Sequence, residues 1–411
     1  MGMGTRTRER SVVKDGVEAR GMKRWAVLVA ASLLIFTSYL MQYQVSALAF
    51  LIIPRYSLDV VSLSNLMFAP MALAAVIGVP LGAAADRFGT KRVVGICVFI
   101  ALGGALLRVV SSDYAMLLVS MLLIGFAPAA MNANLMRLLG AWFQGKTSFA
   151  LGIYYACSGF GAFAALSTAA VVGTMSLAFG GSAALLAFAC VVWFAAVQDA
   201  PAGYDAPAPE NMRVSVKVSA KCSAVWLVAF ITGLSLAAKT AYLSFLPQVL
   251  NLSLDASQAN AMASFVSVGG IVGCALGPFV WRPLKSVKSP MVILTAVTGS
   301  LMALSATLFE PSAALFFLVG VLASVMGPLV EAIPCHVPQL RGCVGSAGGI
   351  IASVSLAVTY FIPLLISFAS QGSCVLVAVS MAICFAAAIP LIIALPGVKA
   401  EDFAERRRLT K

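Results

Sequence analysis

Long apolar stretches and short polar segments alternate along the whole of this chain. The apolar stretches are mostly uncharged, and the segments between them hold most of the Lys, Arg, Asp and Glu residues. About 18 or more apolar residues are enough to cross a bilayer, and lipid favours a helix there because it offers the backbone no hydrogen-bond partners. The pattern therefore predicts an all-α membrane protein with twelve transmembrane helices. The predicted spans are 25–50, 66–85, 93–110, 115–138, 148–172, 175–197, 225–250, 261–280, 291–309, 313–334, 346–369 and 373–395.

The division between the fifth and sixth spans depends on length alone. Residues 148–197 carry no charge, so charge does not mark a boundary there. At about 1.5 Å per residue, one helix of this length would be more than twice as long as a bilayer core is thick. We therefore expect the chain to turn back at residues 173–174 or at residues 180–181.

Composition supports the prediction of a membrane protein, and the distribution of charge predicts its orientation in the membrane. Hydrophobic residues make up 61% of the chain and charged residues 10%, whereas about a quarter of an average soluble domain is charged. If both termini are cytoplasmic, 23 of the 27 Lys and Arg residues fall on the cytoplasmic side, as positive residues usually do. The sequence thus predicts a multi-pass protein of the cell inner membrane. The net charge of +12 is then explained by anionic lipid headgroups, and no nucleic-acid partner is expected.

The chain divides into two similar halves. We expect a cytoplasmic tail at 1–24, a six-helix bundle at 25–197, a cytoplasmic linker at 198–224, a second six-helix bundle at 225–395 and a cytoplasmic tail at 396–411. Residues recur in the second half at shifts of 195 to 200: Ser57, Leu58 and Asp59 as Ser253, Leu254 and Asp255; Gly78, Gly82 and Arg87 as Gly273, Gly277 and Arg282; Asp113 as Glu310; Pro128 as Pro328. Six spans per half make the repeats parallel, an arrangement in which a solute site lies between the halves.

A motif between the second and third spans contains the residues Gly82, Asp86, Arg87, Gly89, Lys91 and Arg92. Its order, Gly-x-x-x-Asp-Arg-x-Gly-x-Lys-Arg, resembles the signature loop of the major facilitator superfamily. The resemblance implies a transporter that exposes a central site alternately to each side, with this motif as a conformational switch. It also implies that Asp86 meets the start of the eleventh span near residues 345–349, with Arg137 in the same network. A solvated basic turn that serves only topology is the alternative.

Ionisable side chains within a membrane span are candidates for function. Lys239 lies about fifteen residues into the seventh span, opposite Tyr43 in the repeat. With polar neighbours it offers one positive charge and several hydrogen-bond donors to a small anion. The candidate solute-binding residues are Lys239, Tyr43, Gln42, Gln44, Tyr242, Tyr360 and Asn132. A structural pair for Lys239, and ordinary interhelical hydrogen bonds for the others, are the alternatives.

Arg137 and Glu331 lie near the inner ends of the fourth and tenth spans and form a candidate cytoplasmic gate. The deep parts of the spans otherwise lack Asp and Glu, which many proton-coupled drug exporters of the superfamily use. A loose similarity to the branches that carry cyanate, nitrite or small carboxylates favours a small organic or inorganic anion. Export of neutral or cationic lipophilic compounds is the alternative, and a non-transporting membrane sensor or scaffold is the alternative of another class.

Enzyme activity is not expected, since the chain has no P-loop and no nucleophile–base pair. Cys335, His336 and Cys343 share a loop, but their spacing fits no common zinc pattern. We therefore expect no metal and no cofactor. The expected partners are the lipid bilayer and a small solute, with a coupling proton or counter-anion left open, and the expected state is a monomer.

The asymmetry of the cations gives a prediction about topology. A reporter fused within residues 201–209 should be cytoplasmic, because that linker carries cations and joins two bundles of even span number. Thiol labels placed at Asp59 or Asp255 should react with an impermeant reagent added outside intact cells. A reporter that is active outside the cell would contradict the twelve-helix arrangement.

Overall fold

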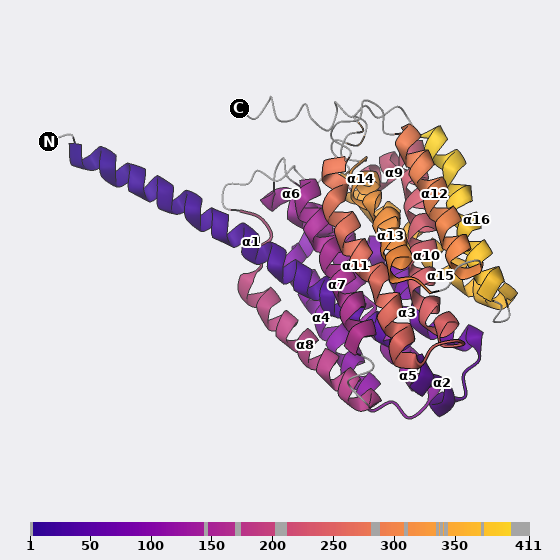
Figure 1. Ribbon diagram of the computed structural model, residues 1–411. Coiled ribbons are helices and arrows are strands. Elements are labelled where there is room, and N and C mark those ends of the chain that lie inside the picture. Colours follow the sequence, from indigo (N-terminus) through magenta and orange to yellow (C-terminus); the bar gives the residue numbers. More distant parts are fainter. Residues whose placement is uncertain are drawn as a thin grey trace.

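The structure is a computed structural model. It describes the backbone of residues 3–143, 147–168, 174–201, 212–280, 288–307, 311–333, 337, 340, 344–370 and 374–395. The described residues form helices joined by short connections (Figure 1). The helices of the first half are α1 (Met3–Ala47), α2 (Ala49–Tyr56), α3 (Val60–Phe88), α4 (Thr90–Val109), α5 (Tyr114–Ile124), α6 (Phe126–Trp142), α7 (Thr147–Thr168) and α8 (Met175–Ala196).

The second half begins with a short helix and then repeats the pattern of the first. Its helices are α9 (Met212–Lys221), α10 (Ser223–Leu250), α11 (Ala256–Val280), α12 (Lys288–Thr307), α13 (Ala313–Val325), α14 (Gly327–Ala332), α15 (Val344–Ser370) and α16 (Cys374–Ala394). Within the described residues, eleven segments are long and apolar enough to cross a membrane, and Val379–Ala394 of α16 is a shorter apolar helix. The fold is therefore consistent with the twelve predicted spans.

Several predicted boundaries differ from those of the structure. The segment predicted as a linker, residues 198–224, contains the helix α9. The predicted turn at residues 173–174 lies outside the described residues except for Thr174, whose hydroxyl caps α8 by accepting a hydrogen bond from the Leu177 N–H at 3.4 Å. Residues 180–181 lie inside α8 and form no turn. Glycine alone is thus a weak turn signal within an apolar helix.

The internal repeat of the sequence is also seen in the structure, at matching helix ends and helix breaks in the two halves. Asp59 and Asp255, which correspond in the two halves, accept hydrogen bonds at 2.9 and 2.8 Å from the backbone N–H groups of Ser62 and Gln258. Each carboxylate thereby satisfies an unpaired donor at a helix start. The fourth span breaks between α5 and α6 and the tenth between α13 and α14, and Pro128 and Pro328 follow those breaks.

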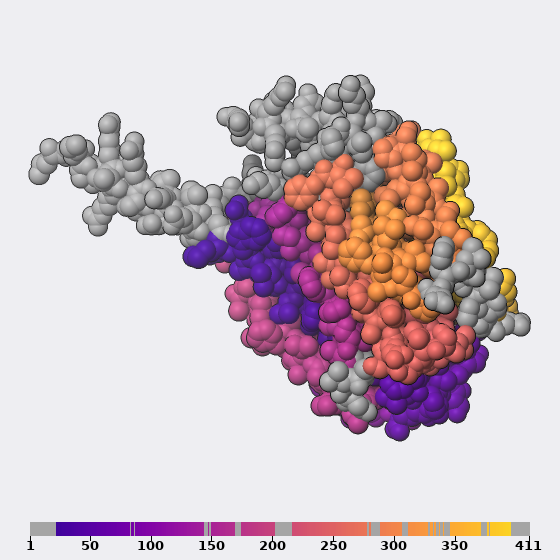
Figure 2. All heavy atoms as spheres, in the orientation of Figure 1, coloured from indigo at the N-terminus to yellow at the C-terminus, as the bar shows by residue number. Residues whose placement is uncertain are grey.

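Contacts between the halves follow the same symmetry. Helix α3 packs against α15, and α7 packs against α11. The repeat exchanges α3 with α11 and α7 with α15, so each contact is the counterpart of the other. Figure 2 shows α7 and α11 meeting along the boundary between the halves. The two six-helix repeats therefore enclose a pseudo-two-fold axis, as expected for parallel repeats.

Small residues allow α11 and α13 to lie close together (Figure 1). A Cβ atom on Gly269 would lie 2.0 Å from the carbonyl oxygen of Phe317, and one on Gly320 would lie 2.1 Å from that of Val266. Gly273 has a similar contact with the Val321 carbonyl, at 2.3 Å. The glycines of α11 thus form a packing face, where the absence of a side chain brings the backbones together.

Gly320→Ala should therefore destabilise the protein. The added methyl group has backbone rather than a flexible side chain in its way, and overpacking of this kind costs about 1–3 kcal/mol. Thermal unfolding of the purified protein in detergent measures the loss. Gly180→Ala is the matched control, because a Cβ there meets nothing within 4 Å. Equal unfolding midpoints for the two variants would contradict the close packing of α11 on α13.

Candidate functional site

A cavity of about 180 Å³ lies between the two halves. Its walls come from α1, α6 and α7 on one side and from α10 to α16 on the other. The volume is below the roughly 300–1,000 Å³ of pockets that hold drug-sized ligands, so the cavity suits a small solute. Its polar and ionisable lining residues are Tyr39, Tyr43, Asn132, Arg137, Tyr155, Ser158, Thr232, Ser235, Lys239, Thr240, Thr298, Ser324, Glu331 and Ser355.

Lys239 of α10 places its ammonium group in this cavity. A methyl group on Gly270 would lie 3.7 Å from the Lys239 Nζ and 3.2 Å from the Ser324 Oγ, so both polar groups converge on the same glycine of α11. None of the Asp and Glu side chains that the structure describes has an oxygen within 4.0 Å of this Nζ. The structural pair considered for Lys239 is therefore not seen among these residues.

Glu331 of α14 connects the halves at the cavity wall. Its carboxylate accepts a hydrogen bond from the hydroxyl of Tyr155, which belongs to α7 in the first half. Arg137 of α6 lines the same cavity and is exposed. The predicted gate residues therefore share one cavity, and their role as a gate stays a prediction.

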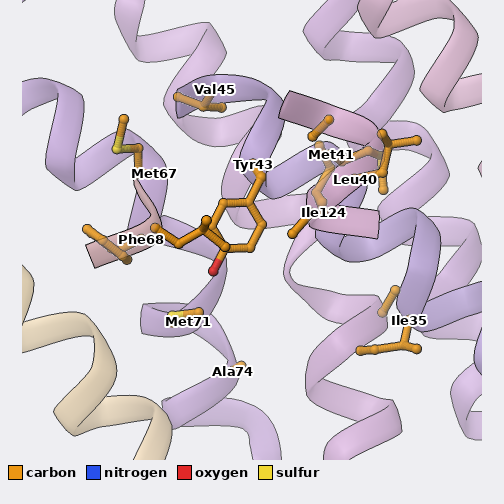
Figure 3. Packing of buried hydrophobic residues seen from close by; sticks show 14 of the residues in the cluster. Ile35, Leu40, Met41, Tyr43, Val45, Met67, Phe68, Met71, Ala74 and Ile124 are labelled. Carbon is orange, nitrogen blue, oxygen red and sulfur yellow. The ribbon is translucent and has the colours of Figure 1, made fainter. Parts of the chain in front are cut away.

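Three of the seven candidate solute-binding residues line the cavity: Lys239, Tyr43 and Asn132. Figure 3 shows the Tyr43 ring beside Phe68 and Met71.

The other four candidates lie elsewhere. Tyr242 shares a hydrogen bond of 2.7 Å with Ser305, and Tyr360 donates one of 2.7 Å to Asn65. Gln42 is buried without lining the cavity, and Gln44 binds Arg108.

Arg108 of α4 is a buried cation that the sequence does not reveal. Its position near the end of a span predicts an interfacial residue, yet its side chain is 0% exposed. The guanidinium donates hydrogen bonds to the Met41 carbonyl at 2.8 Å, to the Gln44 amide oxygen at 2.8 Å and to the Ser182 hydroxyl at 2.7 Å. It also lies over the Phe179 ring, with Cζ 4.2 Å from the ring centroid. Arg108 thus links α4 to α1 and α8.

The motif that resembles the signature loop forms the turn between α3 and α4. Gly89 has a φ of 86°, and a Cβ there would lie 2.6 Å from a carboxylate oxygen of Asp199. That carboxylate accepts a hydrogen bond of 2.6 Å from the Lys91 N–H, and the Lys91 carbonyl accepts one of 3.0 Å from the Trp193 indole. An acidic group is favourable at a helix start. Trp193, near the end of α8, and Asp199, just after it, therefore hold this turn in place.

The remaining motif residues are placed more simply. Arg87 is exposed and lies over Phe88, with Cζ 5.3 Å from the ring centroid, and Arg92 is also exposed. A Cβ on Gly82 would make an ordinary contact with Ala133. The side chain of Asp86 lies outside the described part, so its predicted contact with the start of α15 stays a prediction. Cys335, His336 and Cys343 also lie outside the described residues.

The halves are joined at the end of the bundle where α2 lies, opposite the end where α9 lies (Figure 1). At this α2 end the Ser46 hydroxyl donates to the Ser244 carbonyl, and the Asn260 amide donates to the Ala47 carbonyl at 2.9 Å. The Gln248 amide adds a bond of 3.1 Å to the Ser46 carbonyl. The cavity extends from Lys239 toward the α9 end, where exposed Arg137 lines it. The described residues therefore form a bundle that is closed at the α2 end.

Two parallel six-helix repeats around a central cavity define the fold of a secondary transporter. The sequence also matches the family model described as Major Facilitator Superfamily over residues 27–360. The chain belongs to the Major Facilitator Superfamily, which confirms the resemblance carried by the motif. It is a transporter of small solutes and not an enzyme.

Solved structures share this fold at low identity. The Escherichia coli fucose:proton symporter aligns with a TM-score of 0.65 and 14% identity over 90% of this chain and 100% of that chain. A bacterial homologue of the human lysosomal transporter Spinster, inward-facing and unoccupied, aligns with a TM-score of 0.62 and 16% identity over 93% and 96%. Its inward-facing occupied form gives 0.63 and 15% over 94% and 97%. A comparison with curated proteins found no match.

Arg108→Lys should destabilise the protein. An ammonium lacks the planar donor fork that reaches two helices and stacks on Phe179, and a buried acceptor left unpaired costs about 1–3 kcal/mol. Thermal unfolding in detergent measures this loss. Arg92→Lys, in the exposed first turn of the same helix, is the control and should unfold close to the wild-type temperature. A fully stable Arg108→Lys protein would show that the three hydrogen bonds are dispensable.

Proposed function

We propose that this protein carries a small organic or inorganic anion across the cell inner membrane by rocker-switch alternating access. The observation that carries the proposal is the Lys239 ammonium, which lies in the cavity between the halves with no described carboxylate within 4.0 Å. Moving a charge into a low-dielectric site is unfavourable unless an opposite charge is present. An anionic solute supplies that charge, so ligand and lysine stabilise each other.

The state of the bundle supports the alternating-access part of the proposal. The α2 end is closed by hydrogen bonds between the halves, and the cavity reaches toward the α9 end. We place α9 and the turn that holds Gly89 at the cytoplasm, with both termini, so the structure corresponds to an inward-facing state. Opening to the other side requires the hydrogen bonds at Ser46 and Asn260 to break. Contacts at the α9 end, where the switch motif lies, must then form.

Glu331 extends the proposal to coupling. It is the one carboxylate among the described lining residues, and its hydrogen bond with Tyr155 crosses from one half to the other. Protonation of the carboxylate would change a contact between the halves, which gives a route from proton binding to closure. One protein of this fold is a fucose:proton symporter by its title. A coupling proton is therefore part of the proposal, with a counter-anion as the other possibility.

The alternatives fit the cavity less well. Export of cationic lipophiles would bring a positive solute to Lys239 and Arg137, and the cavity of about 180 Å³ is small for drug-sized compounds. A sensor or scaffold without transport would bind a solute but show no flux. Solute uptake into proteoliposomes distinguishes a transporter from such a sensor or scaffold, because only a transporter gives flux.

Lys239→Gln tests the proposal. Losing a buried charged partner commonly costs about 2–5 kcal/mol, so the affinity for a transported anion should fall roughly thirty-fold or more. Lys239→Arg should also bind weakly, because a planar guanidinium needs different geometry. Isothermal titration of the purified protein with candidate anions measures both effects.

The control is Lys288→Gln, which removes a cation at the start of α12 that donates to the Ile393 carbonyl at 3.0 Å. Its anion affinity should match that of the wild type. A well-folded Lys239→Gln protein with unchanged anion affinity would refute the anion site and leave a neutral or cationic solute as the better hypothesis.

A further inference from the structure

Helix α9 is a short basic helix at the end of the bundle opposite α2 (Figure 1). Its sequence, Met212–Lys221, includes three Lys and Arg residues and no Asp or Glu. The helix packs against α10 and α15. Val216 contacts a hydrophobic cluster that contains Val225 of α10 and Ile350 of α15, and Ser219 is 0% exposed. One side of α9 is therefore held against the protein.

The other side of α9 is exposed and combines charge with apolar surface. Lys217 and Lys221 are both exposed, and their spacing of four residues places them in one stripe along the helix. Val218, three residues before Lys221 and therefore its neighbour on the helix surface, is 38% exposed. Cations beside exposed apolar side chains are typical of a helix that lies in the headgroup region of a membrane.

Trp226 of α10 indicates that this face lies at the depth of the lipid headgroups. Its side chain is 40% exposed, and its indole N–H donates a hydrogen bond of 2.8 Å to the Ala220 carbonyl in the last turn of α9. Trp25, near the start of the first span, has the corresponding place in the first half and is 42% exposed. Tryptophan is enriched at membrane–water interfaces, so two exposed tryptophans at matching places mark that level. Lys221, which follows Ala220, therefore lies where lipid phosphates are found.

We infer that α9 binds the headgroups of anionic phospholipids in the leaflet that it faces, through Lys217 and Lys221. The negative surface potential of such a leaflet attracts cations and falls off within a Debye length, so binding requires the depth that Trp226 marks. None of the described residues that line the solute cavity belongs to α9, so this surface is separate from the proposed anion site. Through its packing on α15, α9 connects the lipid to the helix whose start is the predicted partner of the switch motif.

Trp226 also supplies a local probe for the test. The purified full-length protein is placed in phosphatidylcholine nanodiscs that contain increasing fractions of brominated phosphatidylglycerol, which is anionic, or of brominated phosphatidylethanolamine, which is zwitterionic. Bromine quenches an indole that it contacts, and the signal measured is the part of the fluorescence that Trp226→Phe removes. Phosphatidylglycerol should reach half-maximal quenching at the lower fraction, and added salt should reduce this preference, because salt screens exposed charges.

Lys217→Gln and Lys221→Gln should each reduce the preference for the anionic lipid about five-fold, because each cation near a charged leaflet contributes a similar free energy of attraction. Arg55→Gln is the matched control, since it removes an exposed cation at the α2 end and should leave the preference unchanged. Unfolding midpoints show whether each variant remains folded. Lys239→Gln should keep the lipid preference, because its ammonium lies in the cavity.

The outcomes separate this inference from the proposed function. Equal quenching by the two lipids in the wild-type protein would overturn the lipid site and leave the face to a soluble acidic partner. A preference that survives when Lys217 and Lys221 are both replaced by Gln would also overturn it, because other groups would then hold the lipid. Loss of the preference in Lys239→Gln would contradict the separation of this surface from the cavity. Failure of the anion site alone would leave the lipid preference intact.

Discussion

The interior of a membrane offers no hydrogen-bond partner, and the arrangement of polar side chains in this protein follows from that constraint. The two terminal guanidinium nitrogens of Arg108 find hydrogen-bond partners within the protein, in three hydrogen bonds, and the guanidinium lies over the face of Phe179. The Lys239 ammonium, in contrast, has no described carboxylate within 4.0 Å. The first pattern is typical of a structural cation, and the second is the basis of the anion site that we propose.

The same constraint shapes how the halves meet. Hydrogen bonds from Ser46 and Asn260 to backbone carbonyls close the α2 end. These bonds join two rigid repeats that are otherwise held by paired contacts of α3 with α15 and of α7 with α11. A rocking motion about these paired helices would exchange one closed end for the other. The turn at Gly89, fixed by Asp199, lies at the end that must close.

The sequence predicted the helices, the repeat and the family because each depends on patterns that extend over many residues. It singled out Lys239, which lines the cavity, because a cation deep in an apolar run is rare. The sequence did not predict that Arg108 is buried, because a place near a helix end is also typical of an interfacial residue. Burial at that position depends on how α1 and α8 pack. Gln44 and Tyr242 were assigned to the solute, but packing turned them toward Arg108 and Ser305.

Counterflow in proteoliposomes tests the central claim, carriage of a small anion by alternating access, most directly. Vesicles loaded with unlabelled anion and diluted into a trace of the same labelled anion report exchange through a carrier and distinguish it from leakage through lipid. Carriage by alternating access should give a transient accumulation of label above equilibrium for at least one of acetate, butyrate and nitrate. A time course that matches protein-free vesicles for all three anions, with folded protein in the membrane, would contradict it.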